Sequence, residues 1–149
     1  MAEAQPKLLL PFLQPFYDAV IPLSWPLIRV TVGATLLAHG YNRLIGPSMA
    51  TAAEEFAKNG LEPALLVAYI VFINETIGAV CVMLGLFTRF FAASIAIELA
   101  VISILFAHNG WAWAHHGWEY VFLWGLIFFA IALRGGGPYS LDRKIGWEL

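Results

Sequence analysis

The chain has 149 residues, of which 60 % are hydrophobic and only 12 % are charged, about half the charged share of soluble proteins. This composition excludes an ordinary soluble domain and is typical of a membrane protein. The net charge of −2, without a basic stripe, argues against nucleic-acid binding. The single cysteine, Cys81, excludes an intramolecular disulfide and a two-cysteine redox motif.

The first part of the chain, residues 1–18, contains Pro6, Pro11 and Pro15. Proline removes a backbone donor and clashes with the preceding helical turn. We therefore expect this segment to lie at the membrane surface and not to cross the bilayer.

Four apolar segments follow, each near the length that a membrane-spanning helix needs, roughly 17–25 residues. The expected spans cover residues 19–41, 63–87, 90–107 and 118–134, the last being short for a span. Between the first two, the amphipathic stretch 48–60 predicts a short surface helix that ends at Asn59-Gly60. Runs such as VFLWGLIFFAIAL lack the alternation of a barrel strand. The sequence predicts an all-α integral membrane protein, a four-helix bundle with short loops.

Lysine and arginine are distributed unevenly about the expected spans. If the N-terminus is inside, five of these residues lie on the cytoplasmic side and two on the other. The five are Lys7, Arg89, Arg134, Arg143 and Lys144, and the two are Arg43 and Lys58. Because cytoplasmic loops carry the excess of positive charge, we predict that both termini are cytoplasmic. The expected location is the cell's inner membrane.

Arg29, Glu75 and Glu98 interrupt the first three spans. A charge in the bilayer core costs several kcal/mol, so such residues usually face the bundle interior and pair there. Counted from the expected helix ends at ~1.5 Å per residue, all three lie near the midplane. We expect Arg29 to pair with Glu75, and the less favoured glutamate to hold a proton because burial and a like-charged neighbour both disfavour its ionised form.

This polar site admits two interpretations. A protonatable carboxylate at the midplane suits proton-coupled redox chemistry or proton-driven transport, whereas an ion pair that only fixes helix order would do no chemistry. A further acidic residue, Glu119, opens the fourth expected span nearer the outer face.

Four histidines, His39, His108, His115 and His116, fall on the outer side together with Glu119. Histidines from two helices could ligate a haem or a metal ion. Their spacing matches no specific metal motif, so the sequence does not favour a metal or haem site.

The order and spacing of many of these residues resemble the DoxX family of small four-helix membrane proteins, over nearly the whole chain. The matching positions are Arg29, Gly33, His39-Gly40, Arg43-Leu44, Glu75, Gly78, Gly85, Thr88-Arg89, Glu119 and Ser140-Leu141-Asp142. Glu98 lies outside this shared pattern, and residues 135–138 read GGGP where the family often has GPG.

The DoxX family takes its name from a subunit of an archaeal quinol-oxidising, thiosulfate-linked membrane complex. The resemblance therefore implies a subunit or accessory of a quinone-linked redox complex, with other membrane or redox subunits and the lipid bilayer as its partners. In this hypothesis Glu75 is the group that exchanges protons. Two other functions stay open: a small proton-coupled transporter and a non-catalytic assembly subunit.

Overall fold

The computed structural model describes residues 7–149, and every regular element in this part of the chain is helical. The elements are, in chain order, η1 (Pro11–Leu13), α1 (Gln14–Ile45), α2 (Met49–Lys58), α3 (Ala64–Ile73), the π-helical turn η2 (Asn74–Gly78), α4 (Ala79–Leu84), α5 (Thr88–Phe106), η3 (Ala107–Asn109), η4 (Trp113–His115), α6 (Glu119–Arg134) and α7 (Leu141–Ile145).

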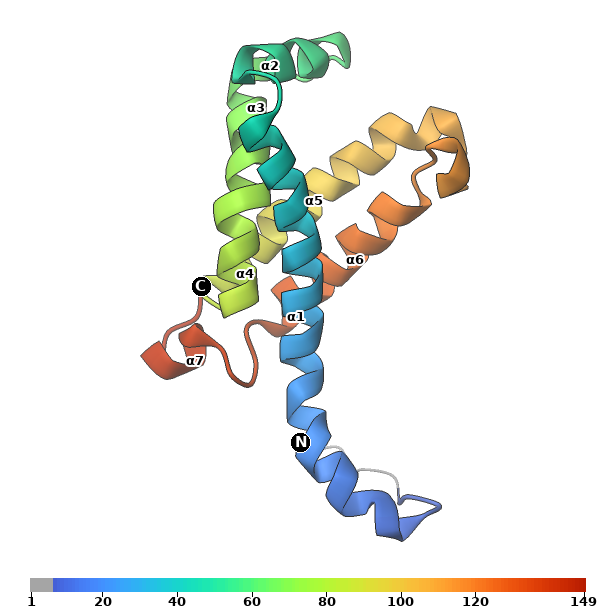
Figure 1. The fold of residues 1–149 in the computed structure, drawn as a ribbon, viewed down its shortest axis with the longest axis vertical. Coiled ribbons are helices and arrows are strands. Elements are labelled where there is room, and N and C mark those ends of the chain that lie inside the picture. Colours follow the sequence, from blue (N-terminus) through green and yellow to red (C-terminus); the bar gives the residue numbers. More distant parts are fainter. Residues whose placement is uncertain (1–6) are drawn as a thin grey trace.

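Two long helical rods and one hairpin make up the molecule (Figure 1). The first rod is α1, and the second is the continuous helix formed by α3, η2 and α4, which packs along α1. The hairpin of α5 and α6 is inclined to both rods and leans away from them toward its connecting loop. The short helix α2 lies across one end of the rods and α7 lies at the other, so we name these the α2 end and the α7 end.

Within residues 7–149, three helical segments are long and apolar enough to cross a membrane. They are Pro11–Ile45, Ala64–Leu84 and Thr88–Asn109. The predicted all-helical membrane protein is therefore confirmed. The fourth expected span corresponds to α6, whose 16 residues reach only about 24 Å. The bundle of four spans accordingly stays a prediction.

The first rod begins earlier than the sequence suggested, because α1 starts at Gln14 and continues through Pro22 and Pro26. At ~1.5 Å per residue, the segment Pro11–Ile45 is about 52 Å long, whereas Ala64–Leu84 is about 31 Å. The start of α1 projects alone past the α7 end (Figure 1), and its first buried residue is Arg29. The predicted surface segment 1–18 thus includes the first helical turns of α1, and residues 1–6 lie outside the described part of the chain.

Small residues allow α1 to approach the second rod closely. A Cβ atom at Gly33 would lie 2.9 Å from the Ala79 carbonyl oxygen, and one at Gly40 would lie 2.7 Å from the Glu75 carbonyl carbon. Both distances are too short for a side chain, so α1 contacts η2 and α4 through backbone. This is the contact that small residues beside polar ones allow between membrane helices.

The α7 end is closed by the segment that follows α6. The buried carboxylate of Asp142 accepts hydrogen bonds from Phe87 N (2.8 Å), Thr88 N (2.9 Å) and Thr88 Oγ1 (2.6 Å). In return, the backbone N–H of Asp142 donates to the Gly85 carbonyl (2.8 Å). Asp142 therefore caps the first turn of α5 and ties the C-terminal segment to the turn between α4 and α5.

We expect Asp142→Ala to lower the free energy of unfolding by about 3 kcal/mol, more than an ordinary cap costs, because three buried hydrogen bonds to a carboxylate are lost together. Thermal unfolding in mild detergent would measure this. Arg143→Ala, at an exposed neighbouring position, should cost no more than about 0.5 kcal/mol. Equal stability of the two variants would contradict the capping role.

Candidate functional site

Arg29 does not pair with Glu75, which corrects the sequence-based prediction. Arg29 is only 1 % exposed and lies at the α7 end, where its Nη2 donates to the Tyr139 carbonyl (3.3 Å). Its guanidinium group packs against Gly85 and lies within electrostatic range of Asp142. Arg29 lies in the middle of α1, but α1 extends past the other helices, so the middle of α1 lies at the end of the bundle. The midplane depth that we expected for Arg29, counted from residue 19, was therefore wrong.

Glu75 pairs instead with Arg43, one turn beyond Gly40 on α1. Arg43 Nε binds Glu75 Oε2, and Arg43 Nη2 lies 3.3 Å from Glu75 Oε1. The guanidinium carbon also lies 5.9 Å from the centre of the Phe56 ring in α2, a cation–π contact. This pair was not predicted from the sequence, because Arg43 was expected beyond the end of the first span, on the outer side. The spacing of Gly33, Gly40 and Arg43 on one helical face was the signal that could have indicated it.

A second polar group joins the second rod to α5. Asn74 Nδ2 donates to Glu98 Oε2 (2.8 Å), and Ser94 Oγ donates to Asn74 Oδ1 (3.0 Å). Glu98 is 8 % exposed, and its Oε1 has no hydrogen-bond partner within residues 7–149. The sequence predicted that Glu98 would be buried, but it gave no indication of the role of Asn74.

The π-helical turn η2 brings these two groups together. It carries Asn74 and Glu75 in succession, and their side chains reach different helices, α5 and α1. A π turn inserts a residue into the helix, redirects neighbouring side chains and is frequent at functional sites. Glu98 lies within electrostatic range of both Glu75 and Arg43. The site therefore contains two carboxylates and one arginine, and this arginine is Arg43 in place of the expected Arg29.

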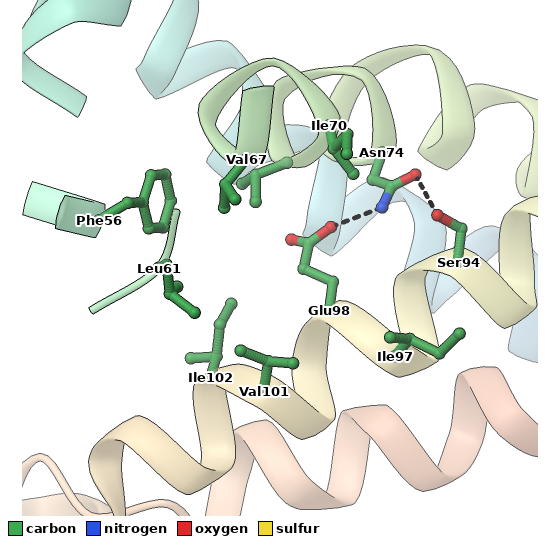
Figure 2. Close-up of a pocket in the computed structure, with 11 residues that line it drawn as sticks. Phe56, Leu61, Val67, Ile70, Asn74, Ser94, Ile97, Glu98, Val101 and Ile102 are labelled. Atoms are coloured by element: carbon green, nitrogen blue, oxygen red, sulfur yellow. Dashed lines mark hydrogen bonds between the residues drawn. The ribbon is translucent and has the colours of Figure 1, made fainter. Parts of the chain in front are cut away.

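A pocket of about 230 Å³ opens in front of Glu98 (Figure 2). Figure 2 shows the Glu98 carboxylate pointing into the space between α3 and α5, with Phe56 at the α2 end of that space. Apart from Glu98, Asn74 and Ser94, the lining is apolar: Phe56, Leu61, Val67, Ile70, Val71, Ile97, Val101 and Ile102. A single carboxyl group among aliphatic walls is thus the chemical feature of this pocket.

A second hollow of about 280 Å³ at the α2 end is also bordered by Phe56. Its lining includes Arg43, Thr51 and Glu55. Phe56 thus borders both spaces, and Arg43, which pairs with Glu75, borders the hollow at the α2 end.

The remaining predicted site residues lie elsewhere. Glu119 is half-buried at the start of α6 and accepts a hydrogen bond from Trp113 N (3.3 Å), so it holds the η4 turn. His39 packs edge-on against Trp124, with ring centres 5.6 Å apart. The exposed histidines at 108, 115 and 116 belong to the loop between α5 and α6. Across residues 7–149, no three side chains of His, Cys, Asp or Glu are grouped to hold a metal ion.

The helices and the buried carboxylates define a small helical membrane protein with a polar site inside its bundle. The DoxX family model matches residues 24–109, and the chain belongs to the DoxX family. The matched region includes Arg43, Glu75 and Glu98. A comparison with curated proteins gave no match, and neither did a comparison with solved structures.

The pair of Arg43 and Glu75 can be tested because its two side chains differ in burial. Arg43→Gln should destabilise more than Glu75→Gln, by about 2 kcal/mol, because the Glu75 side chain is 6 % exposed and would be left charged and buried, while the Arg43 side chain is 32 % exposed. Unfolding in detergent measures both variants, and the double variant should recover part of the loss.

The matched control for this cycle is Arg29→Gln combined with Glu75→Gln, whose effects should add within about 0.5 kcal/mol. Coupling between Arg29 and Glu75, without coupling between Arg43 and Glu75, would contradict the pairing.

Proposed function

We propose that this DoxX-family protein is a membrane subunit or accessory of a quinone-linked redox complex, and that its apolar pocket holds the quinone ring. The observation that carries the proposal is the Glu98 carboxyl group, which points into an apolar pocket and leaves Oε1 without a partner within residues 7–149. A buried polar atom in that position suits a ligand oxygen that accepts or donates one hydrogen bond.

The size of the pocket supports a ring-shaped head group. A dry protein cavity of about 150 Å³ binds benzene, so a pocket of about 230 Å³ has room for a ring with substituents. Two of its lining residues, Ile97 and Ile70, are 67 % and 45 % exposed on the outside of the helices. The pocket therefore opens sideways, toward the lipid, and an isoprenoid tail could leave between α3 and α5.

Glu98, and not Glu75, is the carboxylate that fits proton exchange with this ligand. Arg43 binds both oxygens of Glu75, whereas Glu98 faces the pocket with one free oxygen. A carboxyl group in apolar surroundings can act as a general acid or base near neutral pH. In this proposal Glu98 takes the proton from the quinol hydroxyl that it faces.

Oxidation of a quinol releases two electrons and two protons. The electrons pass to a redox centre on another subunit of the complex, Glu98 takes up the proton of the hydroxyl that it faces, and the second proton leaves from the opposite hydroxyl to water or to that subunit. The proton on Glu98 then leaves toward the hollow at the α2 end, which Arg43 and Glu55 line. Arg43 would keep Glu75 ionised whether Glu98 is protonated or not.

The same proposal includes the orientation and the fourth span. The α7 end would be cytoplasmic, because Arg89, Arg134, Arg143 and Lys144 gather there and only Arg43 and Lys58 lie toward the α2 end. The short helix α6 would cross the bilayer as the partner of α5, which it contacts along its length.

A non-catalytic assembly subunit is the second candidate. The observation that favours it is the segment formed by η1 and the start of α1, which projects past the bundle. It exposes large apolar side chains, among them Phe12, Phe16 and Leu23. A transporter would use the same two carboxylates, and in liposomes it would show proton flux that depends on Glu98.

We expect Glu98→Gln to lower quinone-linked electron transfer at least tenfold in membranes where the complex stays assembled, because glutamine keeps the shape of the side chain but cannot take up a proton. Binding of a short-chain quinone to the purified protein should persist, since the amide still hydrogen-bonds. Ser103→Ala is the matched control, because Ser103 is a buried polar residue of α5 that donates to the Leu99 carbonyl and does not line this pocket.

Undiminished electron transfer in Glu98→Gln, with the complex intact, would overturn the proton role. Failure of the wild-type protein to bind any short-chain quinone, together with loss of a larger complex when the protein is deleted, would support the assembly subunit instead.

A further inference from the structure

The α7 end contains a separate pocket of about 520 Å³, between α1 and the segment after α6. Its lining residues are Pro22, Pro138, Tyr139, Ser140, Arg143 and Lys144. The two cationic side chains are exposed and lie at one edge of a pocket whose other walls are mainly apolar. This arrangement is unlike the Glu98 pocket, in which the single charged group is acidic.

The cations at this pocket are not neutralised by the acids of their own segment. Asp142 is buried and accepts three hydrogen bonds from the turn before α5. Glu148 is engaged with Arg89, at 3.1 Å between Oε2 and Nε, and with the Gly136 N–H. Within residues 7–149, neither Arg143 nor Lys144 forms an ion pair.

A buried positive charge lies behind the same pocket. The guanidinium of Arg29 donates to the Tyr139 carbonyl (3.3 Å), and its Nε and Nη1 have no hydrogen-bond partner within the described residues. Asp142 is the acid within electrostatic range of Arg29. Arg29, Arg143 and Lys144 lie around the Tyr139–Lys144 segment, against the buried Asp142 and the exposed Asp18, which precedes Pro22 by one turn of α1. Three positive charges against two carboxylates leave the local potential positive.

We expect the pocket to lie at the level of the lipid head groups. It lies where α4 ends and α5 begins, near the end of the membrane-spanning segments Ala64–Leu84 and Thr88–Asn109. Tyr139 and Trp147 are highly exposed in the same segment, at 69 % and 83 %. Exposed aromatic rings beside cationic side chains are typical of the membrane–water interface.

We propose that this pocket binds the head group of an anionic phospholipid. The lipid phosphate lies between Arg143 and Lys144, and the acyl chains lie beside the exposed residues Leu23 and Leu27 of α1. Selectivity for an anionic over a zwitterionic lipid follows from the positive local potential, because the zwitterionic head group adds a cation of its own. This inference is independent of the quinone proposal, since it uses different residues at the other end of the bundle.

Native mass spectrometry of the full chain, titrated with phosphatidylglycerol or phosphatidylcholine in mild detergent, tests the proposal. We expect tighter binding of phosphatidylglycerol. Arg143→Gln and Lys144→Gln should each weaken that binding about fivefold, and together about thirtyfold. Lys58→Gln removes the same charge at the exposed C-terminal end of α2 and should leave the binding unchanged.

Thermal unfolding separates lost binding from lost folding, because both substituted side chains are exposed and the variants should unfold like the wild-type protein. Equal affinity for the two lipids would overturn the proposal. So would unchanged phosphatidylglycerol binding in the Arg143→Gln/Lys144→Gln variant, or an equal loss in Lys58→Gln.

Discussion

The close backbone contact between α1 and the π-helical turn is the constraint on which the polar site depends. Gly40 lies directly against the Glu75 carbonyl group, so the two rods are held at a distance that no larger residue would permit. At this distance Arg43, one turn further along α1, reaches the Glu75 carboxylate. Wider separation of the rods would leave a buried carboxylate without its cation, at a cost of several kcal/mol.

The two carboxylates of the site have different environments although they lie close together. Glu75 is neutralised by an arginine, while Glu98 receives one amide hydrogen bond from Asn74 and otherwise faces aliphatic side chains. Neighbouring acids whose surroundings differ in this way are the usual basis for one fixed charge and one exchangeable proton. The π turn creates the difference, because it directs Asn74 and Glu75 to opposite helices.

The buried charges at the α7 end, unlike Glu75 and Glu98, hold segments of the fold together. Asp142 caps α5 and Arg29 fills the space beside Gly85, so these buried groups connect the C-terminal segment to the turn between α4 and α5. The interpretation of Arg29 as a residue that fixes helix order is therefore better supported than a part in proton exchange. Arg143 and Lys144, by contrast, are exposed at the surface of the α7 end.

The sequence by itself determined the helical class, the three long apolar spans, the DoxX family and the burial of Arg29, Glu75 and Glu98, because a charge inside an apolar helix has to face the protein interior. It did not determine which arginine meets Glu75. Arg29 and Arg43 are 14 residues apart, about four helical turns, so they lie on nearly the same face of α1 and periodicity cannot distinguish them. The axial position of α1 against the second rod decides which of the two arginines meets Glu75. That position is set by tertiary contacts between residues distant in sequence.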